Sequence, residues 1–362
     1  MSTFGKSIEV SLFGESHGDS IGITIHNLPS GILLDLDEIA NELLKRRPKS
    51  KLSTPRQEKD TFKFLSGLFN GRTTGSPLTV VIENKDTKSK DYSQAVLRPS
   101  HADFTSHIKY NSYNDYRGSG HFSGRITAPL MILGAISKQL LKTKNISVIS
   151  HISSIKDKYD DSFPQLSISD EIVKKLICSD FPVINDEIKS VFEEVILNAK
   201  NNNDSVGGTI ETAIINLSPG LGEPFFDSME SIISHLIFSI PAVKGIEFGK
   251  GFDITQLFGS EANDSFIMDN GSIKTKTNNS GGIQGGITNG MPIIFKTAIK
   301  PTASIGKPQQ TVNIETLEEV TLELVGRHDP SIVHRVVHVI NAITNYAVLE
   351  MITRKEGFNW IK

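Results

Sequence analysis

Residues 117–141 read RGSGHFSGRITAPLMILGAISKQLL, a glycine-rich loop that runs directly into an apolar helical segment. Thr127 is predicted to cap a helix that continues through Leu141. Backbone N–H groups and the positive end of the helix dipole meet at such a loop, which favours an anionic group there. Its glycine spacing misses the dinucleotide fingerprint by one residue and no hydrophobic strand precedes it, which argues against a Rossmann unit. A turn that merely needs positive φ explains the loop equally well.

The segments before this loop predict strands and one capped helix. Two partly alternating apolar stretches flank the turn at 14–18, which is typical of a strand, a tight turn and a strand. Asp35 with Glu38 three residues later is typical of a helix N-terminus. The predicted elements on this side are strands at 6–13, 20–28 and 78–82 and a helix from Asp35 to the basic residues Lys45, Arg46 and Arg47, stopped by Pro48.

The segments after the loop predict more helices and strands in one continuous arrangement. No internal repeat, low-complexity tract or linker separates autonomous domains. The predicted elements are helices near 169–178, 185–200 and 227–239, strands at 209–217 and 291–295, and a final helix from the Ser331 cap to about Ile352. Residues 1–362 are therefore predicted to form a single composite α+β domain.

Composition restricts the class of protein. The chain has 362 residues, 38% of them hydrophobic, and a formal charge of −3, which predicts a globular protein without a large basic face for nucleic acid. The single cysteine, Cys178, excludes an internal disulfide framework and any multi-thiolate metal site. We see neither a signal peptide nor a run of about 18 apolar residues, so we expect a cytoplasmic protein with no membrane partner.

Several motifs carry competing interpretations. The G-x-S-x-G pattern at 14–18 would make Ser16 a hydrolase nucleophile, but a strand follows it where a nucleophile elbow needs a helix. The basic run at 45–51 is either a solvated loop, a nucleic-acid patch or a contact for a small polyanionic substrate. His334 and His338 stand one helical turn apart, but there is no third metal ligand in sequence, so a core-facing or capping role is favoured over a metal site.

Taken together, the histidines, cations and glycine loops predict one crowded site. Lys300 to Ser304 and Gly326 to Pro330 each combine a cation with hydroxyls or a carboxylate in a loop. With His17, His101 and the basic run, they favour a phosphorylated ligand and a phosphate-bearing cofactor, with histidines as acids.

The same residues resemble the chorismate synthase family. The motifs occur in family order and span nearly the whole chain: GESHG at 14–18, TPRQEKD at 54–60, TTGSPL at 73–78, RPSHAD at 98–103, DYRGSGHFSGR at 115–125, SGGIQGG at 280–286, KPTASI at 300–305 and GRHDP at 326–330. The resemblance implies a lyase of the shikimate pathway for aromatic amino acids. It would catalyse anti-1,4-elimination of phosphate from 5-enolpyruvylshikimate 3-phosphate, giving chorismate, with reduced FMN (FMNH2) required although there is no net redox change.

The resemblance also implies roles for particular residues. His17 would protonate the leaving phosphate, His101 would act beside the reduced flavin, and Asp329 would work with the flavin N5 in proton removal. Substrate phosphate and carboxylates would contact Arg46, Lys51, Arg56 and Arg125. FMN would contact His121, Phe122, Ser123, Glu261, Ala262, Gly285, Lys300, Pro301, Thr302, Ala303, Ser304 and Arg327.

The family fold is a β-α-β sandwich without a Rossmann unit, assembled as a homotetramer. The chain departs from the family pattern at 121–124, where an Arg-Ser-Ser-Ala sequence is usual, and at Lys51, where an arginine is usual; lysine lacks the bidentate fork of arginine. We expect the flavin to be reduced by an external reductant, not by the chain itself with NAD(P)H. The alternatives left open are a flavin-binding protein without elimination activity and a nucleic-acid binder that uses the basic loop.

Overall fold

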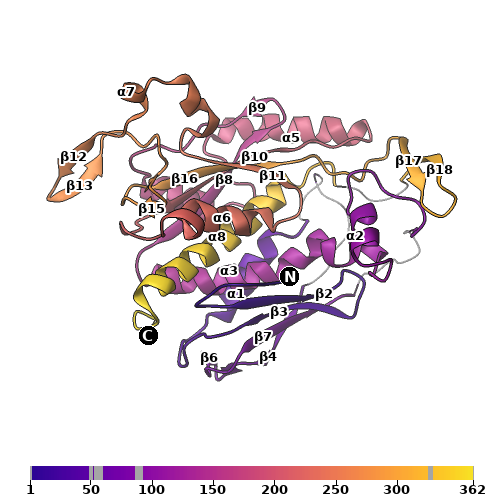
Figure 1. Cartoon of the computed structure of the whole chain (residues 1–362), viewed down its shortest axis with the longest axis horizontal. Coiled ribbons are helices and arrows are strands. Elements are labelled where there is room, and N and C mark those ends of the chain that lie inside the picture. Colours follow the sequence, from indigo (N-terminus) through magenta and orange to yellow (C-terminus); the bar gives the residue numbers. More distant parts are fainter. Residues whose placement is uncertain (1, 49–51, 53–59, 86–92, 325–328, 362) are drawn as a thin grey trace.

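The fold was analysed in a computed structural model that describes residues 2–48, 52, 60–85, 93–324 and 329–361. Two five-stranded sheets lie on either side of a layer of helices, and two further helices cover the outer face of the second sheet (Figure 1). This is the β-α-β sandwich of the α+β class that the resemblance implies, so the predicted fold class is confirmed.

The first sheet is antiparallel and places one face on the core. In β7 (Leu78–Glu83) the residues Leu78, Val80 and Ile82 are buried while their neighbours are less so, which is the period of two expected for a half-covered strand. Its strands lie in the order β1 (Thr3–Phe4), β2 (Val10–Gly14), β3 (Ser20–Ile25), β7 and β4 (Phe62–Ser66).

The second sheet is covered on both faces. Eight successive residues of β8 (Ser147–Ile155) are buried because helices pack on both of its sides. Its strands lie in the order β11 (Val243–Phe248), β16 (Ile293–Ile299), β10 (Gly208–Ile215), β8 and β9 (Lys158–Tyr159), and its outer helices are α4 (Asp170–Cys178) and α5 (Asp186–Asn201).

The helical layer is centred on α3 (Thr127–Lys142) and α8 (Val333–Glu356), which pack along each other between the sheets (Figure 1). Gly134 makes this close approach possible, since a Cβ atom there would lie 2.3 Å from the Cβ of Ala342. By length and composition α8 could cross a membrane, but 94% of its most apolar window is buried inside the molecule, which accounts for its apolar character. The helices α1 (Leu36–Lys45) and α6 (Met229–Phe238) complete the layer.

Helix α8 also anchors the N-terminal segment. The buried carboxylate of Glu350 accepts hydrogen bonds from the backbone N–H groups of Lys6 at 2.6 Å, Ser7 at 3.0 Å and Ile8 at 2.8 Å. Arg354 Nε donates to the same carboxylate at 2.7 Å. Charge-assisted hydrogen bonds of this kind are stronger than neutral ones, so the start of the chain is held against the core.

The remaining elements are short. The helices α2 and α7 and four two-stranded hairpins lie outside the layers. They are α2 (Asp103–Lys109), α7 (Gly259–Ala262), β5 (Leu68–Phe69), β6 (Arg72–Thr73), β12 (Phe266–Asp269), β13 (Ser272–Thr275), β14 (Ile283–Gln284), β15 (Ile287–Thr288), β17 (Gln309–Asn313) and β18 (Glu318–Leu322), with 3-10 turns at Arg117–Phe122, Gly124–Ile126, Phe225–Asp227 and Gly251–Gln256.

The predicted helices and strands are present, but two helix boundaries were wrong. Thr127 is the first residue of α3 and not its cap, because its hydroxyl donates backwards to the Gly124 carbonyl at 2.6 Å. The last helix begins at Val333, and its N-terminal N–H is 3.4 Å from the Ser331 hydroxyl. The interpretation of 1–362 as one domain stays a prediction, although one core cluster draws residues from Ile8 to Ile361.

Candidate active site

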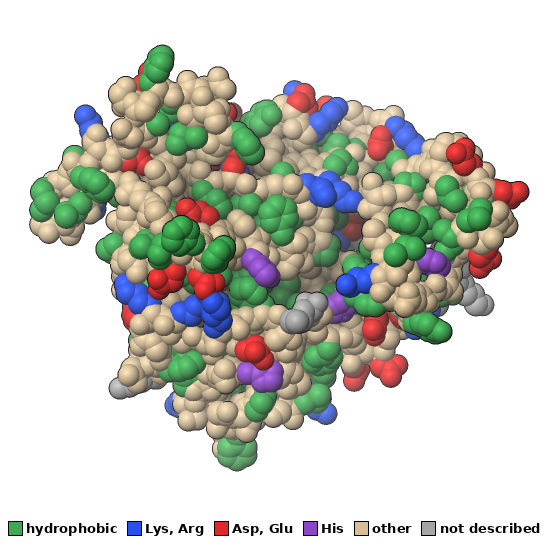
Figure 2. Space-filling view, in the orientation of Figure 1, with side chains coloured by type: hydrophobic (Ala, Val, Ile, Leu, Met, Phe, Trp, Pro, Cys, Tyr) green, Lys and Arg blue, Asp and Glu red, His purple; other side chains and the backbone are tan. Residues whose placement is uncertain are grey.

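A cavity of about 890 Å³ opens between the helical layer and the loops around it. Its walls come from the N-terminal strand, the end of α1, the glycine loop, the end of α6 and the start of α8. Figure 2 shows the hollow on this face, with basic and histidine side chains near it. A volume of this size is at the upper end of what small-molecule sites usually need.

Two loops that are far apart in sequence are joined at the cavity. His101 Nε2 and the Ser304 hydroxyl lie 2.8 Å apart, and Lys300 Nζ donates to the Ser100 carbonyl at 2.8 Å. Both His101 and the predicted cofactor loop from Lys300 to Ser304 line the cavity. The sequence prediction that these motifs share one site therefore agrees with their placement.

A bidentate ion pair fixes the loop that carries His101. Arg98 donates from Nε and Nη2 to the two carboxylate oxygens of Asp103, at 2.8 and 2.7 Å. Burial alone would raise the pKa of Asp103, but the hydrogen bonds and charge of Arg98 outweigh it and hold that pKa below its ordinary value. The carboxylate stays ionised at neutral pH, so the pair holds the loop rigidly.

Three residues of the glycine loop have a backbone conformation that residues with a side chain rarely adopt. Gly118, Ser119 and Gly120 have φ values of 58°, 68° and 51°. A Cβ atom at Gly118 would lie 2.1 Å from Nδ1 and Cε1 of His17, so the missing side chain lets the loop pack directly on that ring. The loop therefore needs positive φ, and it also lines the cavity; its contact with an anionic group stays a prediction.

His17 itself lies behind this loop. Its residue is 7% exposed, and it is not among the described residues that line the cavity, whereas Gly118 is. Gly118, which has no side chain, therefore separates the His17 ring from the cavity.

The predicted cofactor residues after the glycines reach the cavity as well. His121, Phe122 and Ser123 all line it. The His121 ring is placed by two contacts, with Nδ1 at 3.0 Å from the Gly14 carbonyl and Nε2 at 3.0 Å from the Ser2 hydroxyl. These contacts tie the loop to the first sheet.

A buried cluster of charged side chains forms one end of the cavity. The Asp60 side chain is 2% exposed and lies between the guanidinium groups of Arg46 and Arg125. Arg46 Nη1 is 3.5 Å from Asp60 Oδ2, and Arg125 Nη1 donates to Asp60 Oδ1. Both predicted substrate-binding arginines that the structure describes are therefore held in one place.

Asp329 lies four residues before the first residue of α8 and lines the same cavity. Arg335 Nη1 donates to Asp329 Oδ2 at 2.7 Å, and Arg335 Nε donates to the Arg46 carbonyl at 2.9 Å. One arginine on α8 thus connects the predicted proton-transfer carboxylate with the predicted substrate site.

Some predicted residues lie elsewhere or outside the described chain. Glu261, Ala262 and Gly285 are not among the described residues that line the cavity; α7 and the β14–β15 hairpin lie at the opposite end of the molecule from α2 (Figure 1). Gly285 has φ of 62° in that hairpin turn. Lys51, Arg56 and Arg327 fall outside the residues that the structure describes.

Sequence reasoning missed several charged residues that line the cavity, among them Asp60, Arg98 and Arg335. Asp60 is the last residue of the TPRQEKD motif and Arg98 the first of RPSHAD, so both motifs contained the signal. Arg335 follows GRHDP by several residues, and only its position on α8 brings it to the site.

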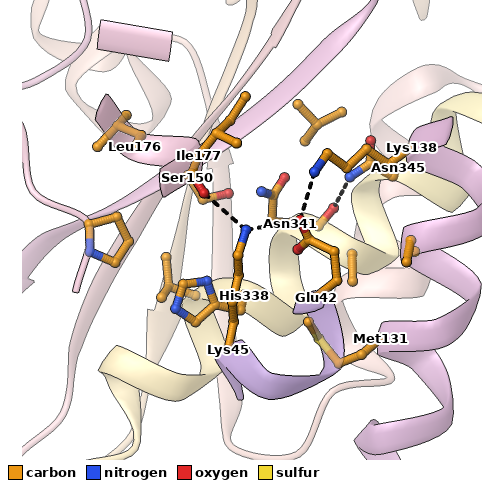
Figure 3. Close-up of a pocket in the computed structure, with 16 residues that line it drawn as sticks. Glu42, Lys45, Met131, Lys138, Ser150, Leu176, Ile177, His338, Asn341 and Asn345 are labelled. Carbon is orange, nitrogen blue, oxygen red and sulfur yellow. Dashed lines mark hydrogen bonds and ion pairs between the residues drawn. The ribbon is translucent and has the colours of Figure 1, made fainter. Parts of the chain in front are cut away.

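The paired histidines of α8 face the core. Burial is the main reason that the pKa of His334 is lowered to about 3 and that of His338 to about 4. His338 lines a second cavity of only about 20 Å³, room for about one water molecule, where Lys45 donates to Glu42 and to the Ile177 carbonyl (Figure 3). Both rings are neutral at pH 7, as expected of core residues.

Comparisons with known proteins agree with this architecture. Residues 8–353 match the sequence profile of the family described as chorismate synthase. The chorismate synthase of Thermococcus kodakarensis is 41% identical over 358 residues, covering 98% of each chain, and that of Methanosphaera stadtmanae is 43% identical over 357 residues, covering 97% of this chain and 96% of its own. A solved structure titled as a crystal structure of chorismate synthase aligns with a TM-score of 0.75 and 26% identity, covering 98% of this chain and 94% of its own.

Proposed function

The chain belongs to the chorismate synthase family, and on that premise we propose that its cavity eliminates phosphate from 5-enolpyruvylshikimate 3-phosphate to give chorismate, with reduced FMN as cofactor. The enzyme class is a phosphate-eliminating lyase of the shikimate pathway. The observation that carries the proposal is that His101, Asp329, two arginines and the Lys300–Ser304 loop line a single cavity.

The residues present fit a flavin mononucleotide. One wall is apolar, formed by side chains such as Val336 and Val339 of α8, and suits a flat ring system. The start of α3 and the cations of the loops also line the cavity and suit a phosphate. FMN would be held by 121–123 and by Lys300 to Ser304, and when bound and reduced it supplies electron density to the reacting allylic system.

The substrate carries a phosphate and carboxylates, so its site needs cations. Arg46 and Arg125 provide them at one end of the cavity, and both are nearly buried. Guanidinium groups match carboxylate and phosphate oxygens two at a time, which orients the substrate as well as binding it. Lys51 and Arg56 would extend this site.

Three residues are proposed to move or stabilise protons. His17 donates a proton to the departing phosphate, because a leaving dianion departs more readily when protonated. Asp329, held by Arg335, takes part in removing the allylic proton. His101 contacts the Lys300–Ser304 loop and keeps the charge balance beside the cofactor. Its contact with Ser304 sets the orientation of the ring.

We further propose that the enzyme works as a homotetramer. Glu261, Ala262 and Gly285 lie away from the cavity of their own chain, so a role for them at the cofactor requires a second copy. The nearby β12–β13 hairpin supports an interface, since it exposes Phe266, Met268 and Ile273 by 67%, 70% and 67%.

The proposal also includes a cytoplasmic location, no nucleic-acid or membrane partner, and an external reductant for the flavin. The reductant is tested by adding NADPH to the enzyme with oxidised FMN in the absence of oxygen. Flavin bleaching by the chain alone would contradict it.

The function is tested by anaerobic phosphate release from 5-enolpyruvylshikimate 3-phosphate with dithionite-reduced FMN, repeated with oxidised FMN. Release that matches chorismate formation and needs the reduced flavin is the expected result. Folded protein that binds FMN but releases no phosphate would favour the flavin-binding alternative.

A further inference from the structure

The side chain of Asn84, which directly follows β7, connects two parts of the site. Its Nδ2 donates to the carbonyls of Glu15 at 2.9 Å and Gly18 at 2.8 Å, across the turn that carries His17. Its Oδ1 accepts from Arg125 Nε at 3.0 Å. One amide therefore closes the turn of the predicted acid and holds the predicted substrate arginine at the same time.

Asp60 holds the other side of the same guanidinium. Arg125 Nη1 donates to its Oδ1, while Arg46 Nη1 and Arg47 Nε lie 3.5 and 3.6 Å from its Oδ2. Arg46 is fixed further by a hydrogen bond from Nη2 to the Gly124 carbonyl at 3.1 Å. The chain Asn84, Arg125, Asp60, Arg46 therefore runs from the His17 turn to the end of α1.

We infer that Asp60 and Asn84 are positioning residues that set Arg125 and Arg46 relative to the turn carrying His17. This inference rests on the proposed function, because it assigns these residues to phosphate elimination. Neither residue is given a role by the family resemblance or by the relatives.

The charge of Asp60 explains why its role is indirect. A carboxylate only accepts hydrogen bonds when ionised and repels an anionic substrate, so it cannot itself hold phosphate. A carboxylate that is 2% exposed beside three guanidinium groups instead fixes the planes of those groups. Arginine side chains have several rotatable bonds, and ordering them before the substrate arrives lowers the entropy cost of binding.

The two residues divide the effect between binding and catalysis. Asp60 contacts the arginines, so its loss is expected to act on substrate binding. Asn84 closes the His17 turn, so its loss is expected to act on proton donation. A residue that served the fold alone would change stability without separating KM from kcat.

The test uses the FMN-loaded enzyme with Asp60→Asn, Asn84→Asp and the control Asp160→Asn. Asp60→Asn keeps the shape of the side chain and removes the charge, and should raise KM for 5-enolpyruvylshikimate 3-phosphate by about 10- to 100-fold with a smaller change in kcat. Asn84→Asp keeps the acceptor for Arg125 but loses both donors to the turn, and should lower kcat by at least about tenfold with a smaller change in KM.

The control removes a similarly buried carboxylate that directly follows β9 and does not line the cavity. Asp160→Asn should lower the unfolding temperature and leave KM and kcat within about twofold. The FMN dissociation constant should be unchanged in all three variants. If Asp60→Asn is unfolded, Asn84→Asp alone decides the inference.

A second readout separates this inference from the proposed function. Binding of 5-enolpyruvylshikimate 3-phosphate to the enzyme with oxidised FMN is measured by calorimetry, which needs no turnover. Weaker binding by Asp60→Asn supports the inference even if the unaltered protein releases no phosphate. The inference is overturned by equal binding and kinetics in Asp60→Asn and the unaltered protein, by an Asn84→Asp enzyme with unaltered kcat, or by an unaltered protein that does not bind the substrate.

Discussion

Two buried clusters of charge lie in this molecule, and they differ in what surrounds them. The cluster around Asp60 borders the large cavity. The cluster around His151 lies in the second sheet, where the ring nitrogens contact Asp160 Oδ2 at 2.9 Å and Glu211 Oε2 at 3.0 Å. Both clusters combine cations and carboxylates, and both are buried. In the first cluster the side chains of Asp60, Arg46 and Arg125 are 8% exposed or less. In the second cluster the three side chains are 2% exposed or less.

The second cluster is closed by the protein itself. The raised pKa of His151 favours the charged ring, whose two nitrogens can both donate to the carboxylates. Asp160 also accepts from the backbone N–H groups of Ile184 and Asn185, and Glu211 accepts from that of Phe163. The cluster therefore ties the second sheet to the segment before α5, and none of its three side chains lines the large cavity.

Buried charge alone therefore does not identify a functional site. A cluster closed by backbone hydrogen bonds holds the fold, whereas one that borders a cavity of ligand size also presents its cations to a ligand. The account therefore predicts that damage to the first cluster changes substrate binding and that damage to the second changes stability.

The largest effect is expected from His151→Leu. Removing the cation leaves two buried carboxylates facing each other, which should lower the free energy of unfolding by about 3–5 kcal/mol. Denaturant unfolding measures the loss, and kcat/KM of the surviving folded enzyme should be unchanged. A loss below about 1 kcal/mol would mean that the cluster is not the structural tie described here.

Gly118→Ala probes the contact between the glycine loop and His17. The new Cβ would overlap the His17 ring, so turnover should fall by about 100-fold or more while FMN still binds. Gly357→Ala is the control for the effect of a positive φ, because φ is 68° at Gly357 and 58° at Gly118. No atom lies within 4 Å of a Cβ added at Gly357, so this variant causes no overlap. An alanine at a positive φ is strained, so the control should lose about 1–3 kcal/mol of stability and keep its turnover. Equal turnover in the two variants would remove His17 from the chemistry.

The pH dependence of stability is a further test of the cluster around His151. Burial would lower the pKa of His151, but hydrogen bonds to Asp160 and Glu211 raise it above its ordinary value. The contribution of His151 to stability is therefore complete below about pH 6.5, the pKa of histidine in the unfolded chain. It is lost as pH rises through the raised pKa of the folded protein. The pKa of Asp160 is lowered, so its contribution is present above about pH 4 and is lost as pH falls through the lowered value.

The stability difference between the unaltered protein and His151→Leu should therefore be largest between about pH 4 and 6.5 and shrink in alkaline solution. Unfolding curves across this range measure it. A difference that grows with rising pH would show that His151 is neutral in the folded state.

The smallest effect on stability is expected at His338, whose pKa is lowered by folding whereas that of His151 is raised. Burial lowers its pKa to about 4, so the unfolded chain takes up a proton between about pH 6.5 and 4 and the folded protein does not. The unaltered protein should lose stability as pH falls through this range. His338→Gln keeps a donor for the Asp180 carbonyl and should lose less stability over the same range. An identical slope in both proteins would contradict the lowered pKa.

Local patterns in the sequence were enough to predict most helices and strands and the meeting of several motifs at one cavity. The Asp35 cap is present, with Oδ1 accepting from the Glu38 N–H at 2.9 Å, because capping depends on residues three apart. The antiparallel pairing of β2 and β3 follows from the tight turn between them. Motifs that contain His101, Asp329 and Lys300 to Ser304 were correctly expected to meet.

Contacts between distant segments could not be predicted in the same way. Asp60 meets Arg125 across 65 positions of sequence, and Arg335 meets the Arg46 carbonyl across 289. No local periodicity carries such information, because it depends on how α1, α3 and α8 pack. The position of Glu261 and Ala262 away from the cavity has the same origin, since a motif does not reveal on which side of the fold it will lie.

The measurement that tests the comparison most directly is the shift in unfolding temperature caused by 5-enolpyruvylshikimate 3-phosphate. It is made on the enzyme with oxidised FMN, for the unaltered protein, Asp60→Asn and Asp160→Asn at one ligand concentration. A ligand that binds only the folded state raises this temperature according to its affinity. The account predicts a lower starting temperature but a full shift for Asp160→Asn, and a reduced shift for Asp60→Asn. Equal shifts in all three proteins, or no shift in the unaltered protein, would contradict it.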